Sequence, residues 1–381
     1  MSKRINVASI GQQFMGRAHS NAFGQAGRFF DLPCTPYLHT VAGRDLKTLP
    51  AFAKRWGWAQ HTGDWRSLAR DPEIELVDIG TPNHVHREQA ILMLEAGKHV
   101  CCEKPLAGTL EDARAMVQAA RASSAKTFVW YNYRRCPAVA LAKKLIEEGR
   151  LGRLYHVRAQ YLQSWGGPET EMSWRFSKEL AGSGAHGDLN AHMVDLARFL
   201  TGDEIEEIHG AVARTFVETR LVAGSGESAE VDVDDAVLFS ASFEGGAVAS
   251  FEASRVAGPH LNGNAIEING SKGSIRFEFE EMNVLRFSDA TRGPREAGWQ
   301  SIMCTSAGNH PYAENWWPDG HVIGYEHTFV NHVADVMRSL GGQEPELALP
   351  DFEDAYQTQR VLEAALIAAE EQRSVLLAEV R

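Results

Sequence analysis

The chain has 381 residues, of which 44% are hydrophobic and 23% are charged, as in ordinary globular proteins. Its 50 acidic and 38 basic residues give a formal net charge of −12, which argues against a surface built to bind nucleic acid or an anionic membrane. No apolar run approaches the roughly 18 residues of a membrane span, and no N-terminal targeting segment is recognisable. We therefore expect a cytoplasmic protein with two domains.

The cysteine and histidine patterns give no sign of a metal site. The five cysteines are Cys34, Cys101, Cys102, Cys136 and Cys304, and none of them forms a C-x-x-C pair. We expect reduced, buried thiols. Because no cluster of His, Cys, Asp or Glu has zinc-ligand spacing, we expect no metal.

Short apolar strands alternate with helices along the first third of the chain. Strands are predicted at residues 5–10, 38–42, 76–79, 98–102 and 127–131, and helices at 15–26, 49–56, 84–96 and after a capping Thr109. This alternation indicates βαβ units, and the nearly all-apolar strands are typical of a parallel sheet covered on both faces. The sequence thus predicts an N-terminal dinucleotide-binding domain, residues 1–130, of the doubly wound Rossmann type.

The pattern changes after about residue 130. A helix is predicted at 137–148, then alternating runs at 154–162, 208–216, 236–243, 247–255, 265–269 and 274–279, and finally helices at 329–340 and 352–371. Alternation with tight glycine turns indicates a large, mostly antiparallel open sheet with one wetter face. We therefore predict an α+β domain over residues 131–381 for substrate binding and oligomerisation.

A glycine-containing turn follows the first predicted strand. The segment 10–16 reads Ile-Gly-Gln-Gln-Phe-Met-Gly and approximates the G-x-G-x-x-G fingerprint of dinucleotide sites. Gly11 permits the tight turn, and the helix N-terminus offers N–H groups to a pyrophosphate. Gln13 replaces the middle glycine, and its amide could donate to a phosphate instead.

The residues after the second strand leave the choice of dinucleotide open. A carboxylate at Asp45 would bind the adenosine ribose of NAD, whereas Arg44 could pair with the 2′-phosphate of NADP.

Polar residues follow two further strands at their carboxyl ends, where ligands bind in open α/β sheets. Thr81, Asn83 and His86 follow one of them, and Glu103 and Lys104 follow the other. A lysine at this edge can hydrogen-bond a developing alkoxide.

Asp188 and His192 are four residues apart at the start of a predicted helix, which places both side chains on one helical face. A carboxylate there can orient an imidazole, which can then remove a hydroxyl proton near neutral pH.

Taken together, these segments resemble the Gfo/Idh/MocA family of oxidoreductases along nearly the whole chain. The resemblance depends on residues 14–20, on Thr-Pro-Asn-His-Val-His at 81–86, on Glu-Lys-Pro-Leu at 103–106, and on Asp188-x-x-x-His192. Residues 132–139, 174–176 and 181–184 are similar to the branch that includes levoglucosan dehydrogenase and some inositol dehydrogenases.

The resemblance implies NAD as cofactor, with NADP not excluded, and a sugar or cyclitol alcohol as substrate. It also implies a homodimer or homotetramer assembled through the C-terminal sheet. It assigns catalysis to Lys104, Asp188 and His192. The expected cofactor-binding residues are Gly11, Gln13, Phe14, Met15, Arg44, Asp45, Thr81, Asn83, His86, Glu103 and Asn132. The expected substrate-binding residues are Tyr133, Gln163, Arg175, Tyr325 and His327, whose aromatic and hydrogen-bonding side chains suit a pyranose.

Two other functions remain open at this point. One is a sensor that binds a dinucleotide without turnover, although it would have no need of Lys104, Asp188 and His192. The other is an enzyme that oxidises a glycoside while holding its cofactor tightly.

Overall fold

The computed structural model describes residues 3–293 and 295–380, which form two compact units. Unit 1 contains residues 3–135, Pro311–Pro318 and Ile323–Tyr356. Unit 2 contains Cys136–His310, Asp319–Val322 and residues 357–380. The sequence predicts a single boundary near residue 130, whereas unit 1 also takes in two segments from the last quarter of the chain.

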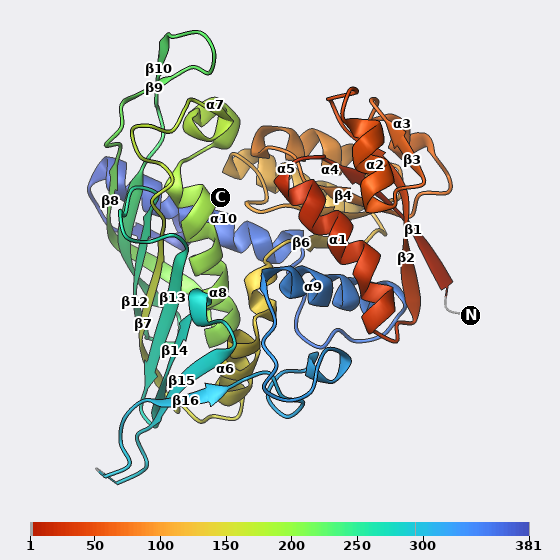
Figure 1. Ribbon diagram of the computed structural model, residues 1–381. Coiled ribbons are helices and arrows are strands. Elements are labelled where there is room, and N and C mark those ends of the chain that lie inside the picture. Colours follow the sequence, from red (N-terminus) through yellow and green to blue (C-terminus); the bar gives the residue numbers. More distant parts are fainter. Residues whose placement is uncertain (1–2, 294, 381) are drawn as a thin grey trace. The chain divides into compact units, whose positions relative to one another are not determined.

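Unit 1 is built on a parallel sheet of six strands in the order β3-β2-β1-β4-β5-β6 (Figure 1). The strands are β1 (Lys3–Ile10), β2 (Cys34–Ala42), β3 (Gln60–Thr62), β4 (Leu76–Ile79), β5 (His99–Cys102) and β6 (Thr127–Val129). Residues 5–10 of β1 and all of β4 are buried, as expected for a sheet covered on both faces. The sequence missed β3, because its three residues are polar and partly exposed.

The helices of unit 1 follow the predicted alternation. They are α1 (Phe14–Phe29), α2 (Leu49–Trp56), α3 (Ser67–Arg70), α4 (His86–Glu95), α5 (Leu110–Ala122) and α9 (Tyr325–Leu340), with short 3₁₀ turns η1 (Asn83–Val85), η2 (Asn132–Arg135) and η6 (Ala313–Asn315). Thr109 caps α5 as predicted, since its side chain accepts a hydrogen bond from the backbone N–H of Asp112.

Helix α9 belongs to unit 1 because its apolar face packs against α1 and η2. A buried ion pair, Arg135 Nη2 to Asp335 Oδ2 at 3.3 Å, ties it to η2. The hydroxyl of Tyr312 donates to the same carboxylate. Both members of the ion pair are fully buried, and Arg338 also pairs with Asp335 at 3.2 Å, so removal of Asp335 would leave the buried charge of Arg135 without its carboxylate.

Unit 2 is built on a sheet of nine strands in the order β16-β15-β14-β13-β7-β12-β11-β8-β17. The strands are β7 (Leu154–Leu162), β8 (Ile205–Arg214), β11 (Ala236–Phe243), β12 (Val248–Ser254), β13 (Gly263–Gly270), β14 (Gly273–Glu278), β15 (Val284–Asp289), β16 (Gln300–Met303) and β17 (Val375–Leu376). A separate two-stranded ribbon joins β9 (Thr219–Leu221) to β10 (Ser228–Glu230). Neighbouring strands of the large sheet are antiparallel except β7 and β12, which confirms the predicted mostly antiparallel sheet.

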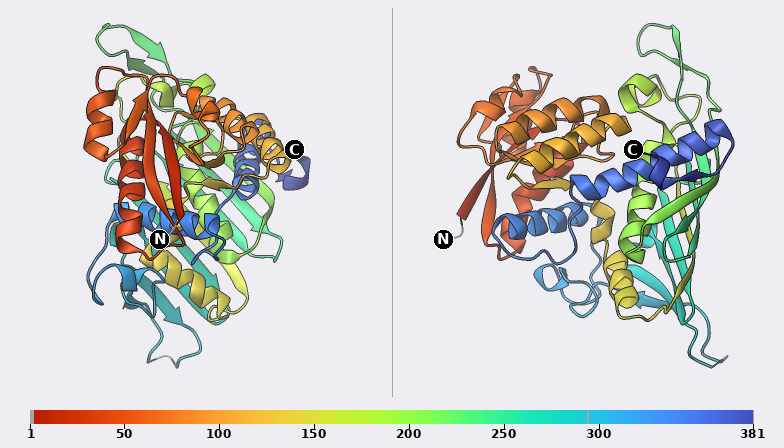
Figure 2. Two further views of the ribbon diagram at one scale, coloured as in Figure 1. Left: turned by 90° about the vertical axis from the view of Figure 1, so that its right-hand side faces the viewer. Right: turned by 180° about the vertical axis from the view of Figure 1, so that it is seen from behind.

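The helices of unit 2 leave one face of this sheet bare (Figure 2). They are α6 (Pro137–Glu147), α7 (Lys178–Ala181), α8 (Ala191–Thr201) and most of α10 (Phe352–Glu371), with the short turns η3 (Trp174–Phe176), η4 (His186–Asn190), η5 (Phe279–Glu281) and η7 (Leu377–Glu379). Along β11, buried and exposed residues alternate, so one set of side chains faces the helices and the other faces outward. The predicted glycine turn is present between β11 and β12, where Gly246 has φ +86°.

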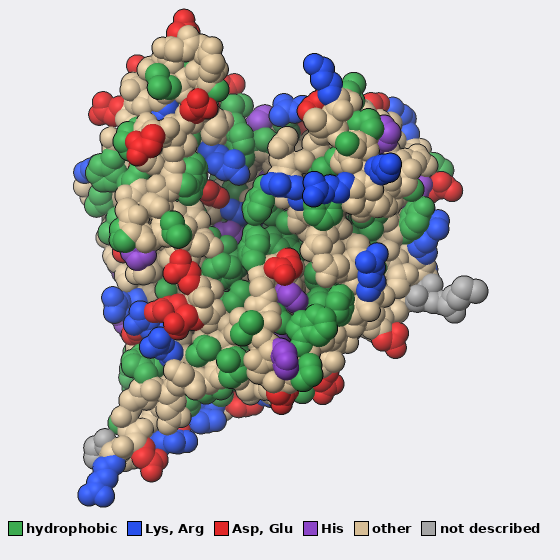
Figure 3. All heavy atoms as spheres, viewed as in Figure 1, with side chains coloured by type: hydrophobic (Ala, Val, Ile, Leu, Met, Phe, Trp, Pro, Cys, Tyr) green, Lys and Arg blue, Asp and Glu red, His purple; other side chains and the backbone are tan. Residues whose placement is uncertain are grey.

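All five cysteines are buried free thiols, as predicted. Among the described residues, no helix has both the length and the apolar character that crossing a membrane requires. On the face shown in Figure 3, basic and acidic side chains are interspersed.

Candidate active site

The turn between β1 and α1 is shaped by two glycines that no other residue could replace without strain. Gly11 has φ +138°, and a Cβ atom there would lie 2.7 Å from the carbonyl oxygen of Gly80. A Cβ atom on Gly16 would lie 2.3 Å from the carbonyl oxygen of Gly11, so the helix packs directly on the turn. Gln13 stands at the N-cap of α1 without a capping side-chain bond, and the first turn carries no acidic residue. The N-terminus of this 16-residue helix is therefore suited to binding an anion.

Around this turn, Phe14 and Met15 differ in exposure. The ring of Phe14 is 54% exposed and stacks in parallel on Tyr325, with 6.5 Å between the ring centroids. Met15 is partly buried against the hydrophobic core of unit 1.

The loop after β2 is held by Gln12, a residue that the sequence analysis did not single out. Its side-chain amide donates to the hydroxyl of Thr48 at 2.9 Å and to the carbonyl of Asp45 at 3.3 Å. A Cβ atom on Gly43 would lie 1.9 Å from the oxygen of this amide, so any larger residue there would displace the Gln12 side chain. Gln12 therefore links the glycine turn to the loop that contains Arg44 and Asp45.

The carboxylate of Asp45 is exposed and remains charged. Its oxygens accept hydrogen bonds from the Thr48 hydroxyl at 2.7 Å and from the backbone N–H of Lys47 at 3.0 Å, and these bonds lower its pKa. Arg44 beside it is also exposed.

At the end of β4, His86 is a bridge inside unit 1. Its two ring nitrogens lie 2.8 Å from the carbonyl oxygen of Thr81 and 3.2 Å from that of Leu106, and burial lowers its pKa. The hydroxyl of Thr81 donates to Gln89. Asn83, which begins η1, is buried. The ring of His86 thus lies between the loop after β4 and the loop after β5.

At the end of β5, the carboxylate of Glu103 is turned inward. One oxygen lies 3.1 Å from Nε2 of His19, and the other accepts a hydrogen bond of 2.9 Å from the backbone N–H of Lys104. Glu103 is only 5% exposed, while Lys104 is half-buried. Both oxygens of Glu103 therefore have partners inside unit 1, and His19 is a residue that the sequence analysis missed.

The remaining predicted residues of unit 1 gather around the start of α9. Asn132 donates to the hydroxyl of Thr328 at 2.8 Å, and the rings of Tyr133 and Tyr325 lie 6.4 Å apart. His327 accepts a hydrogen bond from the backbone N–H of Gly324 at 3.0 Å, and burial lowers its pKa. Its ring also packs edge-on against Trp316 at 4.5 Å. His327 therefore has structural contacts at the N-terminus of α9.

In unit 2, Asp188 and His192 lie where η4, a π-helical turn, continues into α8. The sequence predicts a regular helix with the two side chains on one face. The π turn adds a residue to the helical repeat, and such turns are frequent at functional sites. His192 is 7% exposed and its ring lies 5.9 Å from that of Tyr161, whereas Asp188 is half-buried.

The segment before η4 is held by Asp234. Its two carboxylate oxygens accept hydrogen bonds from the backbone N–H groups of Gly184 at 2.7 Å and His186 at 2.8 Å. A Cβ atom on Gly184 would lie 1.8 Å from the carbonyl oxygen of Asp234, so only glycine fits. The buried guanidinium of Arg255 lies in the electrostatic field of Asp188 and Asp234; burial lowers its pKa, and these carboxylates oppose that effect. Asp234 and Arg255 were not predicted, because both are distant from Asp188 in sequence.

A hydrogen-bonded polar and aromatic group surrounds the end of β7 in unit 2. The oxygen of Asn262 accepts hydrogen bonds from the hydroxyl of Tyr161 at 2.7 Å and from the amide of Gln163 at 2.8 Å. The indole N–H of Trp165, whose side chain is 36% exposed, donates to Gln163 at 2.7 Å. The carbonyl of Arg175 accepts from Arg255 at 3.2 Å. Of the predicted residues of unit 2, Gln163 belongs to this group, which Asn262 completes.

The parallel sheet with its glycine turn is typical of a dinucleotide-binding domain. Residues 5–131 match the model of an oxidoreductase family with an NAD-binding Rossmann fold, and residues 139–276 match the GFO/IDH/MocA C-terminal domain. The chain belongs to the Gfo/Idh/MocA family of oxidoreductases. These matches confirm the predicted fold class and the predicted class of enzyme.

Several relatives are similar over part or nearly all of their length. Levoglucosan dehydrogenase of Pseudarthrobacter phenanthrenivorans is 40% identical over 96% of each chain. The 1,5-anhydro-D-fructose reductase of Ensifer adhaerens is 33% identical over 59% of this chain and 63% of its own. Among solved structures, an oxidoreductase domain protein from Kribbella flavida has a TM-score of 0.94 at 46% identity, covering 99% of this chain and 100% of that one. Levoglucosan dehydrogenase in complex with NADH and levoglucosan has a TM-score of 0.93 at 40% identity, covering 98% and 99%.

Proposed function

We propose that the protein is an NAD-dependent dehydrogenase that oxidises a secondary hydroxyl of a pyranose-type sugar or anhydrosugar. The observation that carries this proposal is the arrangement in unit 2, where the imidazole of His192 lies against Tyr161 and Tyr161 is hydrogen-bonded to Asn262. A proton acceptor beside aromatic and amide side chains suits a ligand with hydroxyl groups on an apolar ring. The 40% sequence identity with levoglucosan dehydrogenase, which extends over 96% of both chains, supports a sugar of this kind as substrate.

The residues of unit 1 fit an NAD molecule. The turn at Gly11 and the N-terminus of α1 would hold the pyrophosphate. The charged carboxylate of Asp45 favours a ribose with free hydroxyls and repels a 2′-phosphate, so we assign NAD rather than NADP. When bound, NAD supplies the acceptor for the hydride.

We assign three roles to side chains of the chain itself. His192 accepts the proton of the hydroxyl that is oxidised, and Lys104 stabilises the negative charge that develops on that oxygen. Asp188 orients His192 or accepts a hydrogen bond from a neighbouring hydroxyl. The buried guanidinium of Arg255 lies in the electrostatic field of this carboxylate.

The substrate hydroxyls would meet the hydrogen-bonded group at the end of β7. We propose Gln163, Asn262 and Arg175 as polar contacts and Trp165 as a surface on which the ring stacks. Tyr133 and Tyr325 remain candidates from unit 1. His327 is a further candidate, whose Nδ1 accepts the backbone N–H of Gly324 at the start of α9.

Nicotinamide reduction by the purified protein tests this proposal. NAD and NADP would be offered separately with levoglucosan, glucose, other pyranoses, inositols and glycosides. We expect turnover with NAD and a pyranose, and a loss of about 100-fold or more in kcat for Lys104→Ala. Lys54→Ala, which removes an exposed lysine of α2, is the matched control and should retain the wild-type rate. An absence of turnover with every pair, or full activity of Lys104→Ala, would contradict the proposal.

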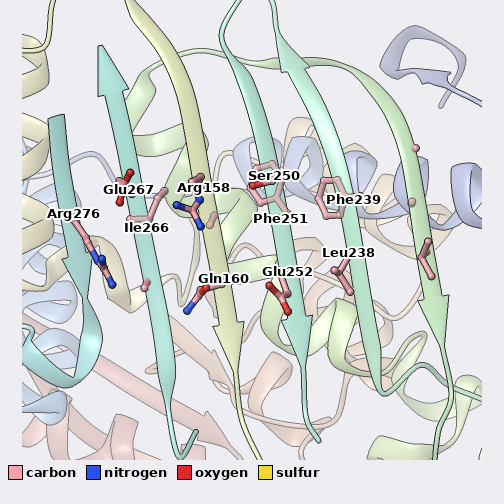
Figure 4. A pocket seen from close by; sticks show the side chains of 15 residues that line it. Arg158, Gln160, Leu238, Phe239, Ser250, Phe251, Glu252, Ile266, Glu267 and Arg276 are labelled. Carbon is pink, nitrogen blue, oxygen red and sulfur yellow. The ribbon is translucent and has the colours of Figure 1, made fainter. Parts of the chain in front are cut away.

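We further propose that the bare face of the unit 2 sheet is covered by a second copy of the chain. The close-up in Figure 4 shows Arg158, Glu252, Glu267 and Arg276 on adjacent strands of this face, with Leu238 beside them. When a surface carries both charges, the acidic residues of one copy can pair with the basic residues of a second copy across a twofold axis. Leu238 is 46% exposed on this face, so a second copy there would bury apolar surface.

A further inference from the structure

His19 on α1 is a fully buried histidine that lies between two buried carboxylates. Its Nδ1 is 3.0 Å from Oδ2 of Asp78, and its Nε2 is 3.1 Å from Oε1 of Glu103. A neutral imidazole has one N–H donor and one acceptor nitrogen, whereas a charged imidazolium has two donors. Because an ionised carboxylate can only accept, two such partners require both ring nitrogens to donate.

The groups around the ring of His19 favour its charged, protonated form. Burial alone would lower its pKa, but attraction and hydrogen bonds from Asp78 and Glu103 outweigh burial and raise the pKa to about 9. Asp78 also accepts hydrogen bonds from the hydroxyl of Ser9 at 2.9 Å and from the indole of Trp130 at 2.8 Å. On α9, His332 stays neutral, since burial lowers its pKa well below the ordinary value.

The contacts of Glu103 connect this charge to Lys104. One carboxylate oxygen of Glu103 faces His19, and the other accepts the backbone N–H of Lys104 at 2.9 Å. A partner at each oxygen restricts rotation of the carboxylate, and its hydrogen bond to the Lys104 N–H restrains that backbone. The contacts therefore connect His19 on α1, through Glu103 at the end of β5, to Lys104. Lys104 is the residue that we propose stabilises the developing negative charge.

We propose that His19 is a positioning residue: as a doubly donating imidazolium it fixes Glu103 and thereby the backbone of Lys104. This inference rests on the role proposed above for Lys104. His19 also stacks on Trp130 at 4.1 Å, but a neutral aromatic ring would fill that space equally well. A charged double donor offers an N–H to each of the two buried carboxylates at once.

The first measurement is made on the wild-type protein labelled with ¹⁵N at histidine. We expect the resonances of His19 to show both ring nitrogens protonated at pH 8, where an ordinary histidine is neutral. A ring protonated at one nitrogen only would overturn the proposal. Because this readout needs no substrate, it is independent of the proposed function and of any loss of folding in a variant.

The second measurement compares His19→Gln with His332→Phe. His332 is equally buried and stacks on Trp130 at 4.7 Å, so it is a matched control that does not touch Glu103. For His19→Gln we expect a fall in kcat of tenfold or more, a Kd for NAD within twofold of wild type, and a displaced amide resonance of Lys104. For His332→Phe we expect the wild-type kcat, the wild-type Kd for NAD and an unshifted amide resonance of Lys104.

A folded His19→Gln variant with the wild-type kcat and an unmoved Lys104 amide would overturn the positioning role. If the wild-type protein oxidised no polyol, the proposed function would be wrong. The protonation of the His19 ring and the amide resonance of Lys104 would still test the contacts that connect His19, Glu103 and Lys104.

Discussion

At the scale of single residues, the buried charge of His19 predicts how stability depends on pH. The pKa rises from 6.5 to about 9 on folding, so the folded state binds this proton more tightly than the unfolded state does. The stabilisation is complete below pH 6.5 and is lost as the pH rises through 9, by about 3 kcal/mol in total. We expect the free energy of unfolding, measured with urea from pH 6 to 9.5, to decline less steeply in His19→Gln than in wild type. Parallel curves would contradict a raised pKa.

His332 predicts the opposite kind of effect. Both of its ring nitrogens are buried without a hydrogen-bond partner among the described residues. Replacing such a group by an apolar ring of similar shape removes a desolvation cost of about 1 kcal/mol. We expect His332→Phe to unfold at a higher urea concentration than wild type, and a lower midpoint would show that the ring has a polar partner.

The candidate site residues that the sequence offers are those that a local pattern marks. Gly11 follows a strand, and Lys104 follows another at its carboxyl end, so neighbouring residues were sufficient. Gln12, His19 and Asn262 were missed because their partners lie at Thr48, Glu103 and Tyr161, far along the chain. Such pairings depend on tertiary structure and leave no periodic signal.

At the scale of elements, the segment before η4 depends on Asp234. Asp234→Asn would replace one of its two acceptor oxygens by an NH₂ group that faces a backbone N–H. We expect a loss of about 1–3 kcal/mol in the free energy of unfolding and a fall in kcat, with the Kd for NAD unchanged. Asp232→Asn is the matched control, because Asp232 is exposed and accepts from Lys178 instead. Equal kcat values in the two variants would show that the segment does not depend on this carboxylate.

Most strands and helices could be predicted, because alternation and apolar periodicity are local properties. The π turn η4 could not, since nearly all residues of η4 and α8 are buried, so no apolar face marks the extra residue. The position of α9 in unit 1 could not either, because it depends on Arg135 and Asp335, which are 200 residues apart.

At the scale of the whole molecule, the bare sheet predicts an oligomer that a single charge would disrupt. We expect light scattering to show a dimer or a tetramer for the wild-type protein and a smaller species for Leu238→Glu. Leu46→Glu is the matched control, because Leu46 is 63% exposed on unit 1 and should leave the assembly unchanged. A monomeric wild-type protein would contradict this proposal.

The central claim is that His192 removes the proton of a sugar hydroxyl while NAD is reduced. The most direct test is the initial rate of NAD reduction with levoglucosan, measured for the wild-type protein, His192→Asn and His61→Asn, which changes an exposed histidine of β3. The account predicts that His192→Asn loses about 100-fold or more in kcat, with NAD binding retained, and that His61→Asn equals wild type. Wild-type turnover by His192→Asn would contradict it.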